Sequence, residues 1–84
     1  MEIHIELTAS DVDCFLEHVT NTSAIAIALL YCGFDILATG EPTNAIHCSE
    51  VDAFLLLEIA KAHCPDAIKR VRDGLRHAGV LVQD

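Results

Sequence analysis

A seven-residue segment occurs twice in this chain, and this repetition constrains the fold more than any other feature of the sequence. Residues 10–16 and 49–55 are identical at five of seven positions, and an Ile-His pair precedes each copy. Similarity between segments this far apart indicates repeated structural units. The alternative is that any two capped amphipathic helices would look this similar.

The composition indicates a single folded domain over residues 1–84. The sequence is 52% hydrophobic, with a mean hydropathy of +0.40, whereas disordered chains combine low hydrophobicity with high charge. A chain of 84 residues is too short for two independent cores. If the repeat is real, its two halves, residues 1–40 and 44–84, therefore share one core.

The start of the chain predicts a strand and then a helix. Residues 3–7 alternate apolar and polar side chains, which is the pattern of a half-buried strand. Ser10 is the expected N-cap of a helix, because the apolar residues that follow, from Val12 to Val19, recur at helical spacing.

Residues 24–32 are ambiguous. Large and small apolar side chains alternate there as in a strand, but alanine favours helices and is depleted in strands. Ser23 before the segment and Gly33 after it are start and stop signals for a helix. We therefore expect a short helix that is apolar all round and buried.

The remainder of the chain predicts a hairpin, two helices and a last strand. Residues 34–38 and 45–48 are the expected hairpin strands, joined by a turn of glycine, proline and polar residues. Helices are expected over residues 49–63 and 65–79, and residues 80–82 form the expected closing strand. The fold class is therefore α+β, with two β-α-α-β units, four helices and a short, mostly antiparallel sheet.

The charges are distributed unevenly along the chain. No lysine or arginine occurs before Lys61, whereas residues 1–60 contain ten carboxylates, and the whole chain carries a net charge of −8. About half of these carboxylates lie in expected first helical turns, where the helix dipole favours anions. The missing counter-charges predict a strongly acidic surface, which affects solubility and the choice of partners rather than the fold.

This charge distribution predicts a partner-binding surface made of acidic residues in the first half of the chain: Glu2, Glu6, Asp11, Asp13, Glu17, Asp35 and Glu41. The expected partner is a basic surface on another protein or on a protein–nucleic acid complex, because opposite charges speed association. The final helix carries a modest basic stripe. Repulsion by the acidic remainder nevertheless disfavours direct binding of nucleic acid.

In size and acidity the chain is similar to small phage-encoded inhibitors, among them anti-CRISPR proteins and nucleic-acid mimics. This similarity lies in composition and involves no matching motif. It implies an inhibitor whose carboxylates occupy the phosphate-binding surface of a host complex.

No motif in the sequence indicates catalysis, so we expect a non-enzymatic protein without a cofactor. The chain contains no G-x-S-x-G, no glycine-rich phosphate loop and no H-E-x-x-H. Its longest apolar run, residues 24–34, has eleven residues, and a membrane span needs about 20. With no signal peptide visible, we expect a cytoplasmic protein that does not associate with membranes.

Four cysteines occur at intervals of 18, 16 and 16 residues, at Cys14, Cys32, Cys48 and Cys64. We expect buried free thiols, as in most cytoplasmic proteins, and no metal ligands. The alternative is a Cys/His metal-binding domain. Cys14 and His18 lie one helical turn apart, and the His47-Cys48 and His63-Cys64 pairs could supply further ligands. Adjacent residues of a strand point to opposite faces, however, so His47 and Cys48 are not expected to bind one ion.

The expected helix over residues 49–63 is apolar on two sides. Either it lies centrally in the fold, or Leu56 and Leu57 on its second side form an oligomer interface, which would make the protein a small structural or regulatory homodimer. Glu58 falls within the other apolar sector. We expect it at the boundary of the core, or paired with an arginine of the next helix, or in contact with a partner.

Repulsion among the carboxylates is expected to destabilise the folded protein, and salt should screen that repulsion. The melting temperature should therefore rise when NaCl is increased from roughly 10 to 150 mM, an interval in which the screening length falls from about 30 to 8 Å. Calorimetry or circular dichroism would measure this, and a flat or falling curve would argue against a cluster of exposed acids.

Overall fold

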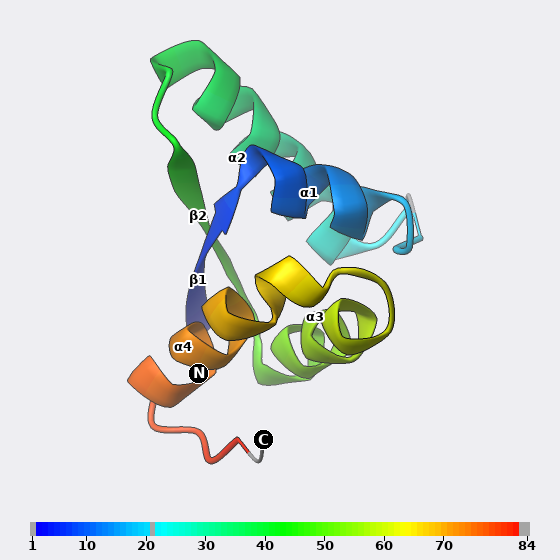
Figure 1. Cartoon of the computed structure of the whole chain (residues 1–84), viewed down its shortest axis with the longest axis vertical. Coiled ribbons are helices and arrows are strands. Elements are labelled where there is room, and N and C mark those ends of the chain that lie inside the picture. Colours follow the sequence, from blue (N-terminus) through cyan, green and yellow to red (C-terminus); the bar gives the residue numbers. More distant parts are fainter. Residues whose placement is uncertain (1, 21, 83–84) are drawn as a thin grey trace.

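Each half of the chain folds as a strand followed by two helices (Figure 1). The computed structural model describes residues 2–20 and 22–82. The first half consists of β1 (Glu2–Thr8), α1 (Ala9–Leu16) and α2 (Ala24–Thr39). The second half consists of β2 (Thr43–Ser49), α3 (Glu50–His63), the short 3-10 helix η1 (Pro65–Ala67) and α4 (Ile68–His77). The α+β class with four α-helices and an antiparallel sheet is thereby confirmed.

The two strands pair over their whole length. The antiparallel ladder runs from Glu2 opposite Ser49 to Thr8 opposite Thr43, with Ile5 opposite Ile46 at its centre. The apolar side chains of β1 are fully buried, and Glu2, His4 and Glu6 are exposed, as the alternating pattern predicts. The sheet therefore has one face in the core and one polar face.

The ladder is symmetric about its centre. A half-turn about an axis through Ile5 and Ile46 would exchange the two strands and place Thr8 on Ser49. Both of these residues are N-caps: the Thr8 hydroxyl accepts a hydrogen bond from the Asp11 amide (3.1 Å), and the Ser49 hydroxyl accepts one from the Asp52 amide (3.2 Å). The sequence comparison paired Ser10 with Ser49, which is two residues out of this register. Duplication of the halves stays a prediction.

Helix α2 is longer than expected. Residues 34–38, predicted as a strand, belong to it, and Gly33 lies within it rather than at its end. The helix instead ends at Gly40, which has a φ of 71°. The apolar positions that α2 buries continue past Gly33 as far as Ile36. Burying a residue such as Ile36 contributes roughly 1.5–3 kcal/mol, which exceeds the cost of about 1 kcal/mol for a glycine inside a helix.

At the C-terminal end of α4 the sequence predicted one feature correctly and one wrongly. Gly79 ends α4 as expected: it has a φ of 86°, and the Val80 amide donates back to the Leu75 carbonyl (3.0 Å). Residues 80–82 were expected to form a strand. Within the described ranges the sheet contains only β1 and β2, so that expectation was wrong. Helix α4 packs closely against β1, where a Cβ on Gly74 would lie 2.7 Å from the His4 carbonyl oxygen.

A buried ion pair joins the two halves. Asp11 is only 3% exposed, and its two carboxylate oxygens accept hydrogen bonds from Nε and Nη2 of Arg70, the latter at 2.7 Å. The Thr8 amide also donates to Asp11 (3.1 Å), and Arg70 also donates to the Asp66 carbonyl (2.7 Å). Asp11 was expected to face a partner. In this fold it is a buried structural residue, because it lies in the first turn of α1 against α4.

Two of the four cysteines are not free thiols. Cys14 in α1 and Cys64 at the end of α3 form a disulfide with a Cα–Cα distance of 6.1 Å, which corrects the expectation of four free thiols. The two residues are 50 positions apart in the chain, so only the packing of α1 against α3 shows that they meet. Cys32 and Cys48 are free and buried, as expected.

The positions of Leu56 and Leu57 in α3 do not agree with the homodimer hypothesis. Leu56 and Leu57 are at most 2% exposed and belong to the core of the single chain, so in this fold they are not available for an oligomer interface. Glu58, expected at the core boundary, is exposed and lies 3.8 Å from the Lys61 ammonium. Helix α3 is thus buried on the Leu56 and Leu57 side only. Val51, Phe54 and Leu55 on its other side are 36–78% exposed, so the expected central position with both sides buried was also wrong.

Replacing Asp11 tests the importance of the buried ion pair. Asp11→Asn should lower the free energy of unfolding by about 2–4 kcal/mol, somewhat less than a fully buried pair would lose, because the Arg70 side chain is 33% exposed and can be partly hydrated. Asp13→Asn, two residues along the same helix at an exposed position, should change it by less than about 0.5 kcal/mol. Urea denaturation measures both, and equal effects would contradict a structural role for Asp11.

Candidate functional site: an apolar helix face and an adjoining cleft

Helix α2 presents an apolar face to solvent. Its exposed large side chains are Ile27, Leu30, Tyr31, Phe34 and Leu37, which are between 45% and 78% exposed. Their spacing of three, one, three and three residues places them on one side of the helix, opposite the buried side chains. We refer to these five residues as the α2 face. The sequence predicted α2 to be buried all round, and this expectation was wrong for half of the helix.

The corresponding helix of the second half does not share this property. Helix α4 packs against β1 much as α2 packs against β2. The exposed positions of α4 carry Lys69, Asp73, Arg76 and His77, which is the usual surface of a solvated helix. The apolar α2 face is therefore a difference between two similarly placed helices and not a consequence of the fold.

The surroundings of the α2 face are acidic or neutral. Asp35 is the only charged residue of α2, and α1 and β2, the two elements that α2 packs against most, contain no lysine or arginine. The Asp35 carboxylate accepts a hydrogen bond from the Asn44 side-chain amide of β2 (3.1 Å). Asp35 is thus held at the border between α2 and β2. In the view of Figure 1, the C-terminal half of α2 projects at the opposite end of the molecule from the basic helix α4.

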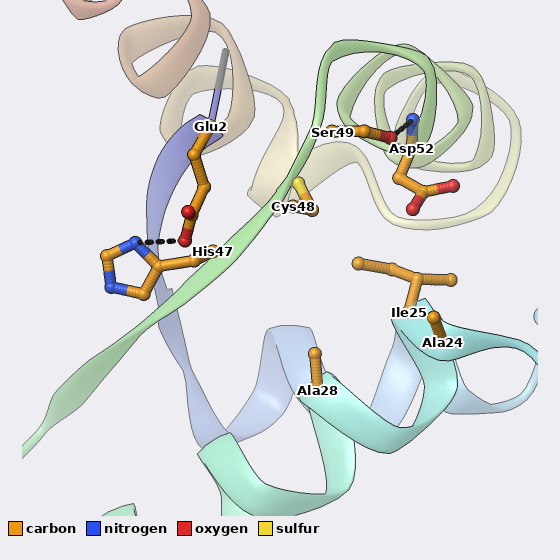
Figure 2. Close-up of a pocket in the computed structure, with 8 residues that line it drawn as sticks. All are labelled: Glu2, Ala24, Ile25, Ala28, His47, Cys48, Ser49 and Asp52. Atoms are coloured by element: carbon orange, nitrogen blue, oxygen red, sulfur yellow. Dashed lines mark hydrogen bonds and ion pairs between the residues drawn. The ribbon is translucent and has the colours of Figure 1, made fainter.

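A cleft of about 490 Å³ adjoins the N-terminal half of α2. Figure 2 shows Ala24, Ile25 and Ala28 projecting from α2 towards the end of β2 and the start of α3. The other lining residues come from β1, β2 and α3 and are mostly polar: Glu2, His47, Cys48, Ser49 and Asp52. The cleft therefore has an apolar wall next to the α2 face and an opposite wall that carries two carboxylates.

Glu2 and His47 interact across the two strands. The Glu2 carboxylate lies 3.2 Å from Nδ1 of His47, and the His47 ring meets the His4 ring edge to face, with centroids 4.8 Å apart. Both partners of the ion pair are more than half exposed, so the pair contributes little to stability. It orients Glu2 at the rim of the cleft (Figure 2).

Cys48 lies in this cleft as a neutral thiol. Burial raises the pKa of Cys48 from its usual 9.0 to about 11, and the carboxylates of Asp52 and Glu2 act in the same direction. A thiolate is the nucleophilic form of cysteine, and Cys48 is not in that form at neutral pH. Cys48 therefore does not supply the cleft with an activated nucleophile.

A second cleft, of about 330 Å³, lies between β1 and α4. It is lined by side chains of both charges together with Gly74: His4, Glu6, Arg70, Asp73 and His77. Arg70 is already bound to Asp11. In the described part of the chain, no group of three or more His, Cys, Asp or Glu side chains is arranged to hold a metal ion.

The carboxylates predicted to bind a partner come from several elements of the fold. Six of the seven are exposed, and they are spread over β1, α1 and the turn after it, α2 and the turn after it: Glu2, Glu6, Asp13, Glu17, Asp35 and Glu41. Only Glu2 lies in the cleft beside α2. The sequence reasoning missed the α2 face itself. The signal was present, since positions 27, 30, 31, 34 and 37 follow helical periodicity, but it depended on extending the helix past Gly33.

Comparisons with protein-family models, with curated proteins and with solved structures found no match. Within residues 2–20 and 22–82, no helix combines the length and apolar character needed to cross a membrane.

The raised pKa of Cys48 predicts a dependence of stability on pH. The thiol ionises near pH 9.0 in the unfolded chain but only near pH 11 in the folded protein, so the unfolded state binds fewer protons between these values. The stability conferred by the neutral thiol is complete below pH 9 and is lost as the pH rises towards 11. The loss should be roughly 1–2 kcal/mol.

The control for this prediction is Cys48→Ala, because every other titrating group is retained. The difference in unfolding free energy between wild type and Cys48→Ala should shrink as the pH rises above 9. Denaturation curves measured over this pH interval test it, and a constant difference would show that Cys48 ionises normally in the folded protein.

Proposed function

We propose that this chain is a non-enzymatic interaction module that binds a cationic, amphipathic helix of another protein on the α2 face. The α2 face carries the proposal: five large apolar side chains on one side of a helix, exposed to solvent in a protein of net charge −8. Exposed apolar patches bordered by polar residues are typical of protein-interaction sites.

The shape of the surface supports a helical partner. A helix that lies against another helix uses side chains spaced by three and four residues, as Ile27, Leu30, Phe34 and Leu37 are. Tyr31 and Phe34 are the aromatic members, and aromatic side chains supply much of the binding energy in interfaces of this kind. The neighbouring cleft, with the small side chains of Ala24 and Ala28 on one wall, extends the surface beyond the N-terminal half of the helix.

The charge around the α2 face supports a cationic partner. Asp35 and Glu41 lie at the C-terminal end of α2 and beyond it, and Glu2 and Asp52 lie in the cleft at its other end. A partner helix with an apolar stripe between lysines or arginines would place its charges near these carboxylates. Such complementarity speeds association and excludes acidic competitors.

An inhibitory role is a narrower form of this proposal. The partner helix could be part of the surface with which the partner binds nucleic acid. Binding of that helix to α2 would then prevent the partner from binding nucleic acid. This route to inhibition relies on the apolar α2 face together with the acids beside it. It does not require the seven predicted carboxylates to form one phosphate-like array.

A model peptide tests the proposal without knowledge of the natural partner. The probe is a labelled helical peptide of leucine and lysine with leucines at positions i, i+3, i+4 and i+7. We expect the full chain to bind it, and to bind a leucine–glutamate peptide of the same pattern at least about tenfold more weakly. Phe34→Ser with Leu37→Ser should weaken binding of the leucine–lysine peptide by at least about tenfold. Fluorescence anisotropy measures both, at low and at moderate salt.

The control variant is Leu81→Ser, which replaces an apolar side chain that is 94% exposed but lies outside α2. It should leave peptide binding unchanged. Equal binding of the acidic and basic peptides, or equal binding by the double variant and the wild type, would overturn the proposal. Sedimentation provides a further check. If the wild type is a dimer, and if Phe34→Ser with Leu37→Ser dissociates it, then the molecule that covers α2 is a second copy of this chain.

A further inference from the structure

Asp11 and Asp52 occupy equivalent positions in the two halves of the chain. Each is the third residue of the helix that follows a strand, Asp11 in α1 and Asp52 in α3. Each donates its backbone amide to the hydroxyl of an N-cap, Thr8 (3.1 Å) or Ser49 (3.2 Å), and the symmetry of the ladder exchanges these two caps. The half-turn that relates the strands therefore also relates the two carboxylates.

Arg70 and Ala28 are equivalent in the same way. Helix α4, which carries Arg70, packs against β1, and helix α2, which carries Ala28, packs against β2. Both residues are half-buried. Each is followed at the first and fourth positions by buried residues: Val71 and Gly74 in α4, Leu29 and Cys32 in α2. Ala28 thus stands where an arginine stands in the other half.

The two halves differ in what fills the space beside the carboxylate. In one half the Arg70 guanidinium donates to both oxygens of Asp11. In the other half the cleft of about 490 Å³ lies between α2 and Asp52, and Figure 2 shows the Asp52 carboxylate and the Ala24 side chain facing it. None of the described residues that line this cleft is a lysine or an arginine. The cleft is therefore the counterpart of the ion pair without its guanidinium.

The lining of the cleft suits an arginine side chain. The methylene groups of arginine pack against apolar surface while its charged end reaches polar groups, and Ala24, Ile25 and Ala28 form such an apolar wall. The planar guanidinium donates two parallel hydrogen bonds to one carboxylate, as Arg70 does to Asp11, whereas a lysine ammonium is a single point charge. Glu2 at the rim adds a second negative charge.

We propose that the cleft receives an arginine side chain of the partner protein, and that its guanidinium binds Asp52 as Arg70 binds Asp11. This inference rests on the proposed function, because the arginine belongs to the helix that lies on the α2 face, and the cleft adjoins the N-terminal half of α2. It adds a specific requirement: at one position of the partner helix, arginine is preferred to lysine.

Supplying the guanidinium from the chain itself tests whether the cleft fits it. Ala28→Arg places an arginine at the position equivalent to Arg70, and Asp52→Asn removes its partner. We expect the two substitutions to be coupled by at least about fivefold in the unfolding equilibrium constant, because the guanidinium pairs with the carboxylate. The control is Ala38→Arg, at an exposed alanine near the C-terminal end of α2, which should show no coupling to Asp52→Asn. Urea denaturation of all the variants measures both.

Peptides test whether a partner supplies the arginine. The leucine–lysine peptide is compared with versions in which one lysine at a time is replaced by arginine. At one position the arginine peptide should bind the wild-type chain at least about fivefold more tightly, and Asp52→Asn should abolish that preference. Glu41→Gln removes an exposed carboxylate beyond the other end of α2 and should retain the preference. Fluorescence anisotropy measures these affinities.

The outcomes separate this inference from the proposed function. If the peptides bind with no Asp52-dependent preference for arginine, or if Ala28→Arg folds and is not coupled to Asp52→Asn, the inference is wrong and the proposed function stands. If no peptide binds although Ala28→Arg is coupled to Asp52→Asn, the proposed function is wrong. The cleft then remains a guanidinium site for a partner that does not use the α2 face.

Discussion

The buried ion pair between Asp11 and Arg70 joins the two halves of this protein. A carboxylate out of contact with water is stable only when it is paired and hydrogen-bonded, and Asp11 has Arg70 and the Thr8 amide as partners. Because Arg70 also donates a hydrogen bond to the Asp66 backbone carbonyl, the pair links the start of α1 to η1 and α4. The β1–β2 ladder aligns the strands, and this ion pair together with the Cys14–Cys64 disulfide holds the helices of the first half against those of the second.

The two halves share one order of elements, so a difference between their helix surfaces does not follow from the fold. Both halves follow the order strand, helix, helix, and the ladder between them is symmetric about its centre. Within that shared frame α4 has a charged surface, as expected for a solvated helix, whereas α2 has apolar side chains on both sides. Exposed apolar side chains such as Phe34 and Leu37 contribute little to the stability of the single chain, so the folding of this chain alone does not explain them.

The disulfide and the buried ion pair both join residues of α1 to residues far away in the sequence. Cys14 is separated from its partner Cys64 by 50 positions, so the sequence does not show that they meet. The same holds for Asp11 and Arg70, which are 59 residues apart. Propensity and periodicity describe neighbours in the chain. They do not indicate which ends of which helices meet.

The sequence by itself determined the local structure wherever a single pattern dominated. It determined the alternation of β1, the N-cap at Ser23, the helix over α3 and the stop at Gly79, because each depends on side chains within one or two turns of the chain. The tertiary structure alone decided that α2 continues through Gly33, that Asp11 is buried and that Leu56 and Leu57 belong to the core. It also decided which cysteines pair and which side of α2 remains exposed. These outcomes depend on packing between distant elements, where the burial of apolar side chains outweighs local preferences of about 1 kcal/mol per residue.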